Sequence, residues 1–126
     1  MQVRDWLLVD GQCRAIWAAM TKDEVGQIHS MGGSRALSNR TVVELIPRTV
    51  GKPQRLTTTV KDRPGHDRRY AITTEKLERA TGWRVLVTVE DGLARTIDWY
   101  KHNAEWIQRV HSNAHQECQA HNYQRG

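Results

Sequence analysis

The segment 61–70 holds the residues best suited to chemistry in this chain, and it reads KDRPGHDRRY. Charged residues, proline, glycine and histidine make up nearly all of it, so we predict a loop. The chemistry would depend on five consecutive residues: Asp62, Arg63, Pro64, Gly65 and His66. A rigid proline and a permissive glycine between two cationic side chains can direct a guanidinium and backbone N–H groups toward an anion. Arginine binds phosphate in a planar, bidentate way that suits a diphosphate. The alternative is a solvated basic turn without a ligand.

Two isolated residues are further candidates. Arg4 precedes Asp5 and Trp6, and its guanidinium can bind an anion in the same way. The alternative for Arg4 is a surface ion pair with Asp5 beside a buried tryptophan. Asn39 follows Ser38 at the start of an apolar stretch, and the residues alone favour a helix cap over a ligand contact there.

Four potential metal ligands lie near the C-terminus at spacings of four, three and three residues: His111, His115, Cys118 and His121. Such spacings would align imidazole and thiolate groups on one face of a helix. The residues between them are poor helix formers, and no pattern of carboxylates that would orient the imidazoles accompanies them. We therefore predict a polar tail over residues 110–126 and no metal site.

The sequence offers no carrier for catalysis. No G-x-G-x-x-G motif follows a predicted strand, and no P-loop, G-x-S-x-G, H-E-x-x-H or C-x-x-C motif is present. None of the three tyrosines has a lysine four positions later, which excludes a Tyr-x-x-x-Lys acid/base pair. We expect no catalytic residue and no bound cofactor, and in particular no NAD site, within these residues.

Composition narrows the remaining classes. The chain of 126 residues carries 19 Lys and Arg against 14 Asp and Glu, a formal charge of +5. Its basic residues are scattered and no recognition motif accompanies them, so a nucleic-acid partner is not favoured. The longest apolar run, Ala15–Met20, is far shorter than the roughly 18 residues that span a bilayer. The charged N-terminus does not resemble a secretory signal, and the two cysteines are far apart, so we expect a cytoplasmic protein without disulfides or a membrane partner.

The pattern of apolar residues predicts alternating strands and helices, and therefore an α/β class with one domain over residues 1–126. The predicted strands are Val3 with Trp6–Val9, Val25–Met31 and Leu56–Val60, and residues 83–89 are predicted to be strand-like or extended. A first helix is predicted after Asp10, with its buried face formed by Cys13, Ile16, Trp17 and Met20.

Three more helices are expected. One covers Thr41–Ile46 and stops or kinks at Pro47, because proline lacks a backbone donor. A short one follows Thr73 and Thr74 and ends at Gly82. The last begins at Glu90, with an apolar face at Leu93, Ile97, Tyr100, Ala104 and Ile107.

Several strings of residues together resemble a known family. They are Val3-Arg4-Asp5-Trp6-Leu7, Gly32-Gly33, Asn39 before Val42-Val43, residues 62–72 (DRPGHDRRYAI), Gly82-Trp83, and Gly92-Leu93 with Trp99-Tyr100. The chain is similar, from Gln2 to about Arg125, to the C-terminal part of dTDP-glucose 4,6-dehydratases, which are extended short-chain dehydrogenase/reductases. The resemblance implies a small substrate-binding domain of short strands and helices. The Rossmann portion of that family, which holds NAD and the catalytic residues, has no counterpart in these residues.

The resemblance also implies a role for each candidate. Arg4 would face the diphosphate of a nucleotide sugar, and Asn39 would contact the nucleotide. Residues 62–66 would form the loop on the nucleotide side, and Tyr123 would return from the C-terminal tail to close the site. For Arg4 and for the loop, these roles replace the simpler alternatives given above.

The expected function is thus binding of a dTDP-sugar or a simpler nucleotide, without catalysis by this chain alone. The alternative is a structural or interaction domain that forms a dimer or pairs with a separate Rossmann chain, because a domain without its Rossmann portion exposes apolar surface. The sequence departs from the family pattern at Asp10-Gly11-Gln12, at Ser30-Met31 and at Pro47. These departures suggest relaxed demands on the pocket or its packing.

Overall fold

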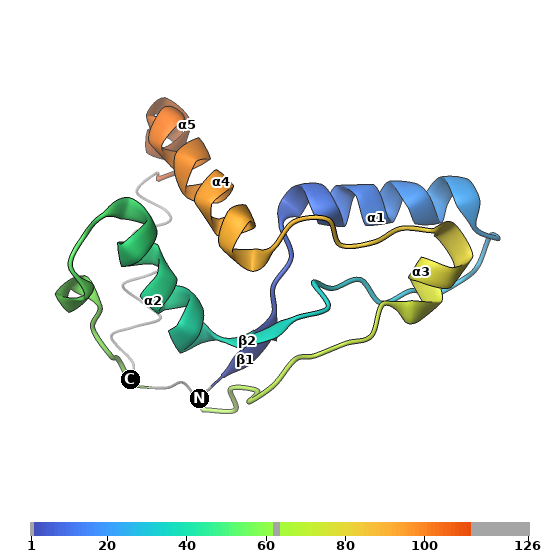
Figure 1. Ribbon diagram of the computed structural model, residues 1–126, viewed down its shortest axis with the longest axis horizontal. Helices are drawn as coiled ribbons and strands as arrows, with labels where there is room; N and C mark the ends of the chain where they lie inside the picture. The colour runs from blue at the N-terminus through green and yellow to red at the C-terminus, as the bar shows by residue number, and fades with distance from the viewer. Residues whose placement is uncertain (1, 62–63, 112–126) are drawn as a thin grey trace.

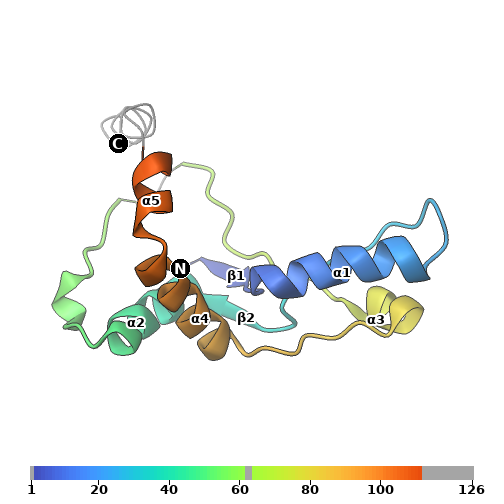
Figure 2. The ribbon, with the colours of Figure 1, turned by 90° about the horizontal axis from the view of Figure 1, so that it is seen from above.

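The computed structural model describes residues 2–61 and 64–111 (Figure 1). Its helices are α1 (Val9–Lys22), α2 (Asn39–Val50), α3 (Glu75–Thr81), α4 (Val89–His102) and α5 (Ala104–Val110), and η1 (Gln54–Leu56) is a single 3-10 turn. Two strands, β1 (Val3–Asp5) and β2 (Ala36–Ser38), form an antiparallel sheet. The sheet lies between α1 and α3 at one end and α2, α4 and α5 at the other (Figures 1 and 2). No helix in the described ranges is both long and apolar enough to cross a membrane.

The strand β1 has hydrogen-bond partners on both edges. On one edge it pairs with β2 in a register that sets Val3 opposite Ser38 and Arg4 opposite Leu37. On the other edge, the Val3 amide donates to the Arg68 carbonyl (2.8 Å) and the Tyr70 amide donates to the Val3 carbonyl (3.0 Å). The loop after residue 63 therefore returns alongside β1, and it brings its polar residues to the strand.

The helix α1 buries the face opposite to the one predicted. Ala15 and Ala18 pack with Leu77 of α3 and with Trp83 in the largest core cluster. The residues predicted to be buried are exposed: Cys13, Ile16, Trp17 and Met20. That prediction is wrong because two small alanines let α3 approach closely, and the burial of Leu77 and Trp83 against them sets the helix orientation.

The start of α1 also differs from the prediction. The helix begins at Val9, so Trp6–Val9 is not a strand. Asp10 lies inside the first turn, where a carboxylate favours the helix dipole, and Leu8 occupies the cap position without a side-chain bond.

The helix α2 continues through Pro47 to Val50, so the predicted stop is wrong. Pro47 removes one helical hydrogen bond, the one to the carbonyl of Val43, and the helix continues for three more residues with the proline side chain buried. At the other end, the hydroxyl of Ser38 accepts the amide of Thr41 at 3.0 Å. Ser38 is therefore the cap, and Asn39 is the first helical residue.

The third helix agrees with its prediction and the fourth differs in part. α3 ends at Gly82, which has a φ of 72° in the left-handed region that glycine tolerates. α4 begins after Thr88, whose hydroxyl accepts the amide of Asp91 at 3.1 Å. Asn103 separates α4 from α5, so the apolar face predicted to be continuous is divided between two helices.

The strand predictions for Val25–Met31 and Leu56–Val60 are wrong, because neither segment forms a ladder. Residues 83–88 are not a strand either. Within the described residues, β structure is confined to the two-stranded sheet and one bridge between Val3 and Arg69. The fold combines both element types and is dominated by helices.

Candidate functional site

Arg4 is the centre of the candidate site. It is partly buried in the middle of β1, and its Nη1 donates to the carbonyl of Val3 at 2.7 Å. Its Nη2 donates to Nε2 of His66 at 2.9 Å and to the carbonyl of Asp67 at 3.0 Å. The structure thus joins two predicted site residues, Arg4 and His66, that lie 62 positions apart in the chain.

Two residues that the sequence analysis did not single out complete this cluster. The Tyr70 ring lies under the guanidinium, with 4.7 Å between Cζ of Arg4 and the ring centroid. The Tyr70 hydroxyl donates to the carboxylate of Asp67. Both residues belong to the same string as His66, but a loop has no periodicity from which such contacts can be predicted.

The neighbour of Arg4 in the strand has a separate role. The Asp5 carboxylate accepts the amides of Gly33 (2.9 Å) and Arg35 (3.3 Å), and so fastens the chain that enters β2. A Cβ at Gly33 would lie 1.7 Å from the carbonyl oxygen of Trp6, so this contact requires glycine. The simple alternative of an Arg4–Asp5 ion pair is therefore wrong. Successive strand residues face opposite sides, and each of the two has its own partners.

Asn39 lies at the end of the same sheet. Its amide donates to the Gln2 carbonyl at 2.9 Å, which extends the pairing of β1 and β2 by one residue. Its side-chain Oδ1 is buried and has no hydrogen-bond partner among the described residues. A buried acceptor without a partner costs about 1–3 kcal/mol, so this oxygen is suited to a donor supplied by a ligand.

The remaining predicted residues divide into two groups. Pro64 and Gly65 form an exposed turn, and Gly65 has a φ of 69°, which favours glycine. Asp62, Arg63 and Tyr123 lie outside the described residues. Of the proposed metal ligands, His115, Cys118 and His121 also lie outside, and no group of three possible ligands occurs in the described part of the chain.

Comparison with known proteins shows which family the chain belongs to. The family described as GDP-mannose 4,6 dehydratase matches residues 1–96, which include β1, β2, the loop and the first half of α4. The chain belongs to this family. Membership supports the resemblance to extended short-chain dehydrogenase/reductases that the sequence indicates.

Individual dTDP-glucose 4,6-dehydratases are similar to most of this chain. A dTDP-glucose 4,6-dehydratase of Escherichia coli K12 is 38% identical over 98% of the chain, and one of Xanthomonas campestris is 44% identical over 86%. The crystal structure of the Bacillus anthracis dTDP-glucose 4,6-dehydratase in complex with NAD superposes with a TM-score of 0.78, at 42% identity over 84% of the chain. The chain spans about one third of the length of each: 36%, 34% and 33%.

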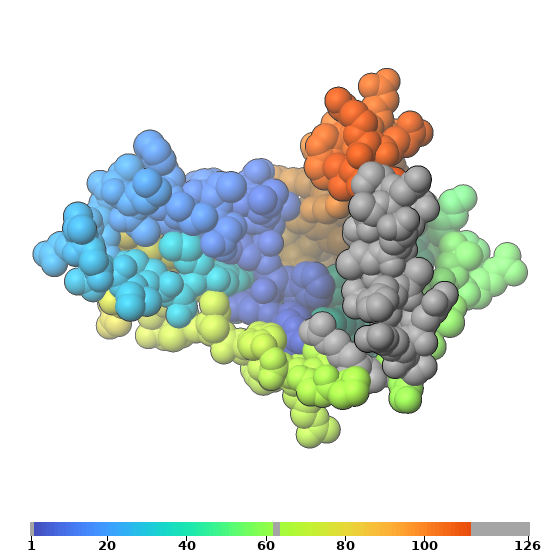
Figure 3. All heavy atoms as spheres, turned by 180° about the vertical axis from the view of Figure 1, so that it is seen from behind, coloured from blue at the N-terminus to red at the C-terminus, as the bar shows by residue number. Residues whose placement is uncertain are grey.

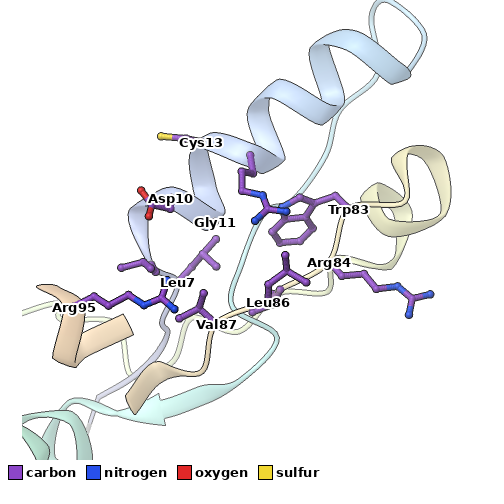
Figure 4. Close-up of a pocket in the computed structure, with 12 residues that line it drawn as sticks. Leu7, Asp10, Gly11, Cys13, Trp83, Arg84, Leu86, Val87 and Arg95 are labelled. Carbon is purple, nitrogen blue, oxygen red and sulfur yellow. The ribbon is translucent and has the colours of Figure 1, made fainter. Parts of the chain in front are cut away.

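The chain also contains a hollow of about 330 Å³, and Arg4 is not among the residues that line it (Figure 4). It lies between the start of α1 and residues 83–87, and apolar side chains such as Leu7, Trp83 and Val87 form much of its lining. In Figure 4, Cys13 and Arg84 point away from these apolar side chains. The hollow is also lined by four charged residues: Asp10, Arg14, Arg84 and Arg95. No hydrogen bond or ion pair joins these four described residues to one another, unlike the contacts around Arg4, so we place the candidate site at Arg4.

Proposed function

We propose that this chain binds a dTDP-sugar or a related nucleotide through Arg4, Asn39, the loop 62–66 and Tyr123. On this proposal it corresponds to the C-terminal, substrate-binding portion of a dTDP-glucose 4,6-dehydratase. The observation that carries the proposal is the contact of 2.9 Å between Arg4 and His66. Two groups that can bind phosphate oxygens are held together by elements far apart in the sequence.

The chemistry of the site suits a nucleoside diphosphate. An arginine guanidinium offers five N–H donors in a plane, a shape that matches phosphate oxygens. The unpartnered Oδ1 of Asn39 can accept a hydrogen bond from an N–H or hydroxyl group of the nucleotide. The sheet thus supplies a donor for the anion at Arg4 and an acceptor for the nucleoside at Asn39.

We do not expect this chain to catalyse dehydration by itself. In the reaction named for its relatives, hydride removal and return require a nicotinamide, and the 126 residues contain no dinucleotide-binding motif. The chain would supply the part that holds the substrate's nucleotide.

Isothermal titration of the chain with dTDP and dTDP-glucose tests the proposal. We expect wild-type binding, and a loss of at least about tenfold in Arg4→Ala, because a charge-assisted contact to phosphate is removed. The matched control is Arg79→Ala on α3, which removes the same charge from an exposed position and is expected to bind like the wild type. No heat with wild-type protein, or an equal loss in both variants, would overturn the proposal.

The surface of the chain favours a second candidate function, in which it associates with another chain. Its accessible area is 10161 Å². A globular protein of its mass is expected to expose about 6,900 Å². The 108 described residues alone would expose about 6,100 Å² as a globular protein, and the other 18 residues are allotted about 3,000 Å², the area of an extended chain of that mass. About 1,000 Å² of surplus remains on this basis. A standard interface buries about 800 Å² per partner, so the surplus is large enough for one.

The outer face of α1 is one apolar part of this surface (α1 is blue in Figure 3). Val9, Trp17 and Met20 are each about two-thirds exposed or more. We propose that this face associates with a second copy of the chain or with a separate chain that carries a Rossmann domain. Sedimentation velocity over a range of concentrations, alone and with such a chain, tests this. Monomers under both conditions, or association that Met20→Glu leaves unchanged, would contradict it.

A further inference from the structure

The two unpredicted residues of the cluster, Asp67 and Tyr70, have no role in the proposed function as stated so far. We propose that they are positioning residues that keep the charge of Arg4 available to an anionic ligand. This inference rests on the proposed function, since it concerns how the same site meets a phosphate.

Tyr70 is fixed beside Arg4 by its backbone. Its amide donates to the Val3 carbonyl at 3.0 Å, which fixes its backbone to the neighbour of Arg4 in β1. Its ring then lies 4.7 Å from Cζ of Arg4, inside the range of about 6 Å over which a cation is attracted to an aromatic face. The ring covers one face of the guanidinium, and because all N–H groups lie in the guanidinium plane, this contact uses none of them.

The carboxylate of Asp67 is hydrogen-bonded to Tyr70 and not to Arg4. The Asp67 backbone carbonyl accepts from Arg4 at 3.0 Å, but its carboxylate accepts the hydroxyl of Tyr70. Within the described ranges, Arg4 forms no ion pair with any carboxylate. An arginine so close to an aspartate would ordinarily pair with it, and the Tyr70 hydroxyl holds the carboxylate in a different contact.

Arg4 has N–H donors left over after its contacts within the described part of the chain. The contacts to Val3, His66 and Asp67 use three of its five N–H groups. No acceptor among the described residues takes the other two. The guanidinium is thus fixed in orientation and keeps both its net charge and two donors for a ligand.

The hydroxyl of Tyr70 gives the sharpest test, because its removal should free the Asp67 carboxylate to pair with Arg4. We expect Tyr70→Phe to bind dTDP about three- to tenfold more weakly than the wild type in isothermal titration at fixed ionic strength. The double variant Tyr70→Phe with Asp67→Asn removes the competing charge and should return to within about twofold of the wild type. A purely structural role for Tyr70 would not give this rescue. Tyr100→Phe on α4 is the matched control and should bind like the wild type.

A second measurement needs no ligand. The ring of Tyr70 should shift the NMR signals of the Arg4 side chain upfield in the wild type and in Tyr70→Phe, and the shift should disappear in Tyr70→Leu. If the wild type fails to bind dTDP, the proposed function is wrong, and the NMR shift still decides whether Tyr70 covers Arg4. If the wild type binds but Tyr70→Phe binds equally well, the positioning role is wrong and the proposed function stands. An unchanged Arg4 signal in Tyr70→Leu would overturn the inference in either case.

Discussion

The strand β1 and the segment 25–31 differ in what surrounds them more than in their own residues. β1 is only three residues long, yet it is bonded on one edge to β2 and on the other to residues 68–70. The segment 25–31 is more than twice as long and has alternating side chains, but it forms no strand. Val25 is fully exposed and Ile28 is 84% exposed. Backbone partners on a neighbouring element, and not the local pattern of residues, therefore decide which segment becomes a strand here.

Polar side chains hold the segment 25–31 in place of a ladder. His29 is buried and its Nε2 contacts the carboxylate of Asp23, at the end of α1. Lys76 of α3 donates to the Ile28 carbonyl (2.9 Å) and to the side chain of Gln27 (3.0 Å). The segment is therefore tethered at a few points, whereas β1 is built into the framework.

The largest expected effect on stability comes from adding a side chain at Gly33, next to β1. Gly33→Ala would place a Cβ 1.7 Å from the Trp6 carbonyl oxygen, so the backbone must move and the Asp5 contact must break. We expect a loss of at least about 3 kcal/mol in the free energy of unfolding, measured by urea denaturation. The control in the tethered segment is Gly26→Ala, where a φ of 90° is strained but the space is open. It should cost about 1 kcal/mol, and equal losses in the two variants would remove the distinction between the regions.

A smaller effect is expected at the carboxylate that fastens β2 to β1. Asp5→Ala leaves the amides of Gly33 and Arg35 without their acceptor, which should cost about 2 kcal/mol in the same measurement. Glu24→Ala removes an exposed carboxylate from the chain just before the tethered segment and should change stability by less than about 0.5 kcal/mol. A wild-type unfolding midpoint in Asp5→Ala would show that β1 does not depend on this contact.

The contact between Asp23 and His29 should make stability depend on pH in the acid range. The Glu24 amide and the hydrogen bond with His29 lower the pKa of Asp23 below its ordinary value of 3.8. Because the folded-state pKa is depressed, the carboxylate stabilises the fold above the ordinary pKa, and this contribution is lost as the pH falls through the folded-state value. We expect the melting temperature of the wild type to fall more steeply below about pH 4 than that of Asp23→Asn. Glu24→Gln is the control, because it removes an exposed neighbouring carboxylate, and it should keep the wild-type slope. Identical curves for wild type and Asp23→Asn would contradict the prediction.

The smallest effect is expected at Val25. Its side chain is fully exposed, so Val25→Ser should change the free energy of unfolding by less than about 0.5 kcal/mol. Val42 of α2 is 4% exposed, and Val42→Ala should cost about 1–3 kcal/mol by thermal denaturation. A large effect at Val25 would mean that the segment is covered in solution.

The sequence predicts local features well where a single residue decides them. Gly82 marks the end of α3, Ser38 with Asn39 marks the start of α2, and Val3 lies in a strand. It fails at α1, because apolar residues occur on two opposite faces and only the approach of α3 selects the face of Ala15. Such choices depend on contacts between elements, which periodicity within one element does not contain.

The candidate site shows the same division. Residue types make the loop and Arg4 candidates for anion binding, and the family resemblance adds Tyr123 and a nucleotide contact for Asn39. Neither predicts that Asp67 turns its carboxylate to Tyr70 rather than to Arg4. That arrangement follows from the return of the loop along β1, a pairing between residues more than 60 positions apart.

The shortness of β1 makes its register decisive. Arg4 and Asp5 are adjacent, and their side chains leave the backbone on opposite sides. A slip of one residue would exchange their places. A carboxylate would then face the proposed anion site, and a cation would stand where Asp5 now accepts the amide of Gly33. A one-residue insertion between Gln2 and Arg4 should therefore reverse the electrostatic preference of the whole site, even though every side chain is retained.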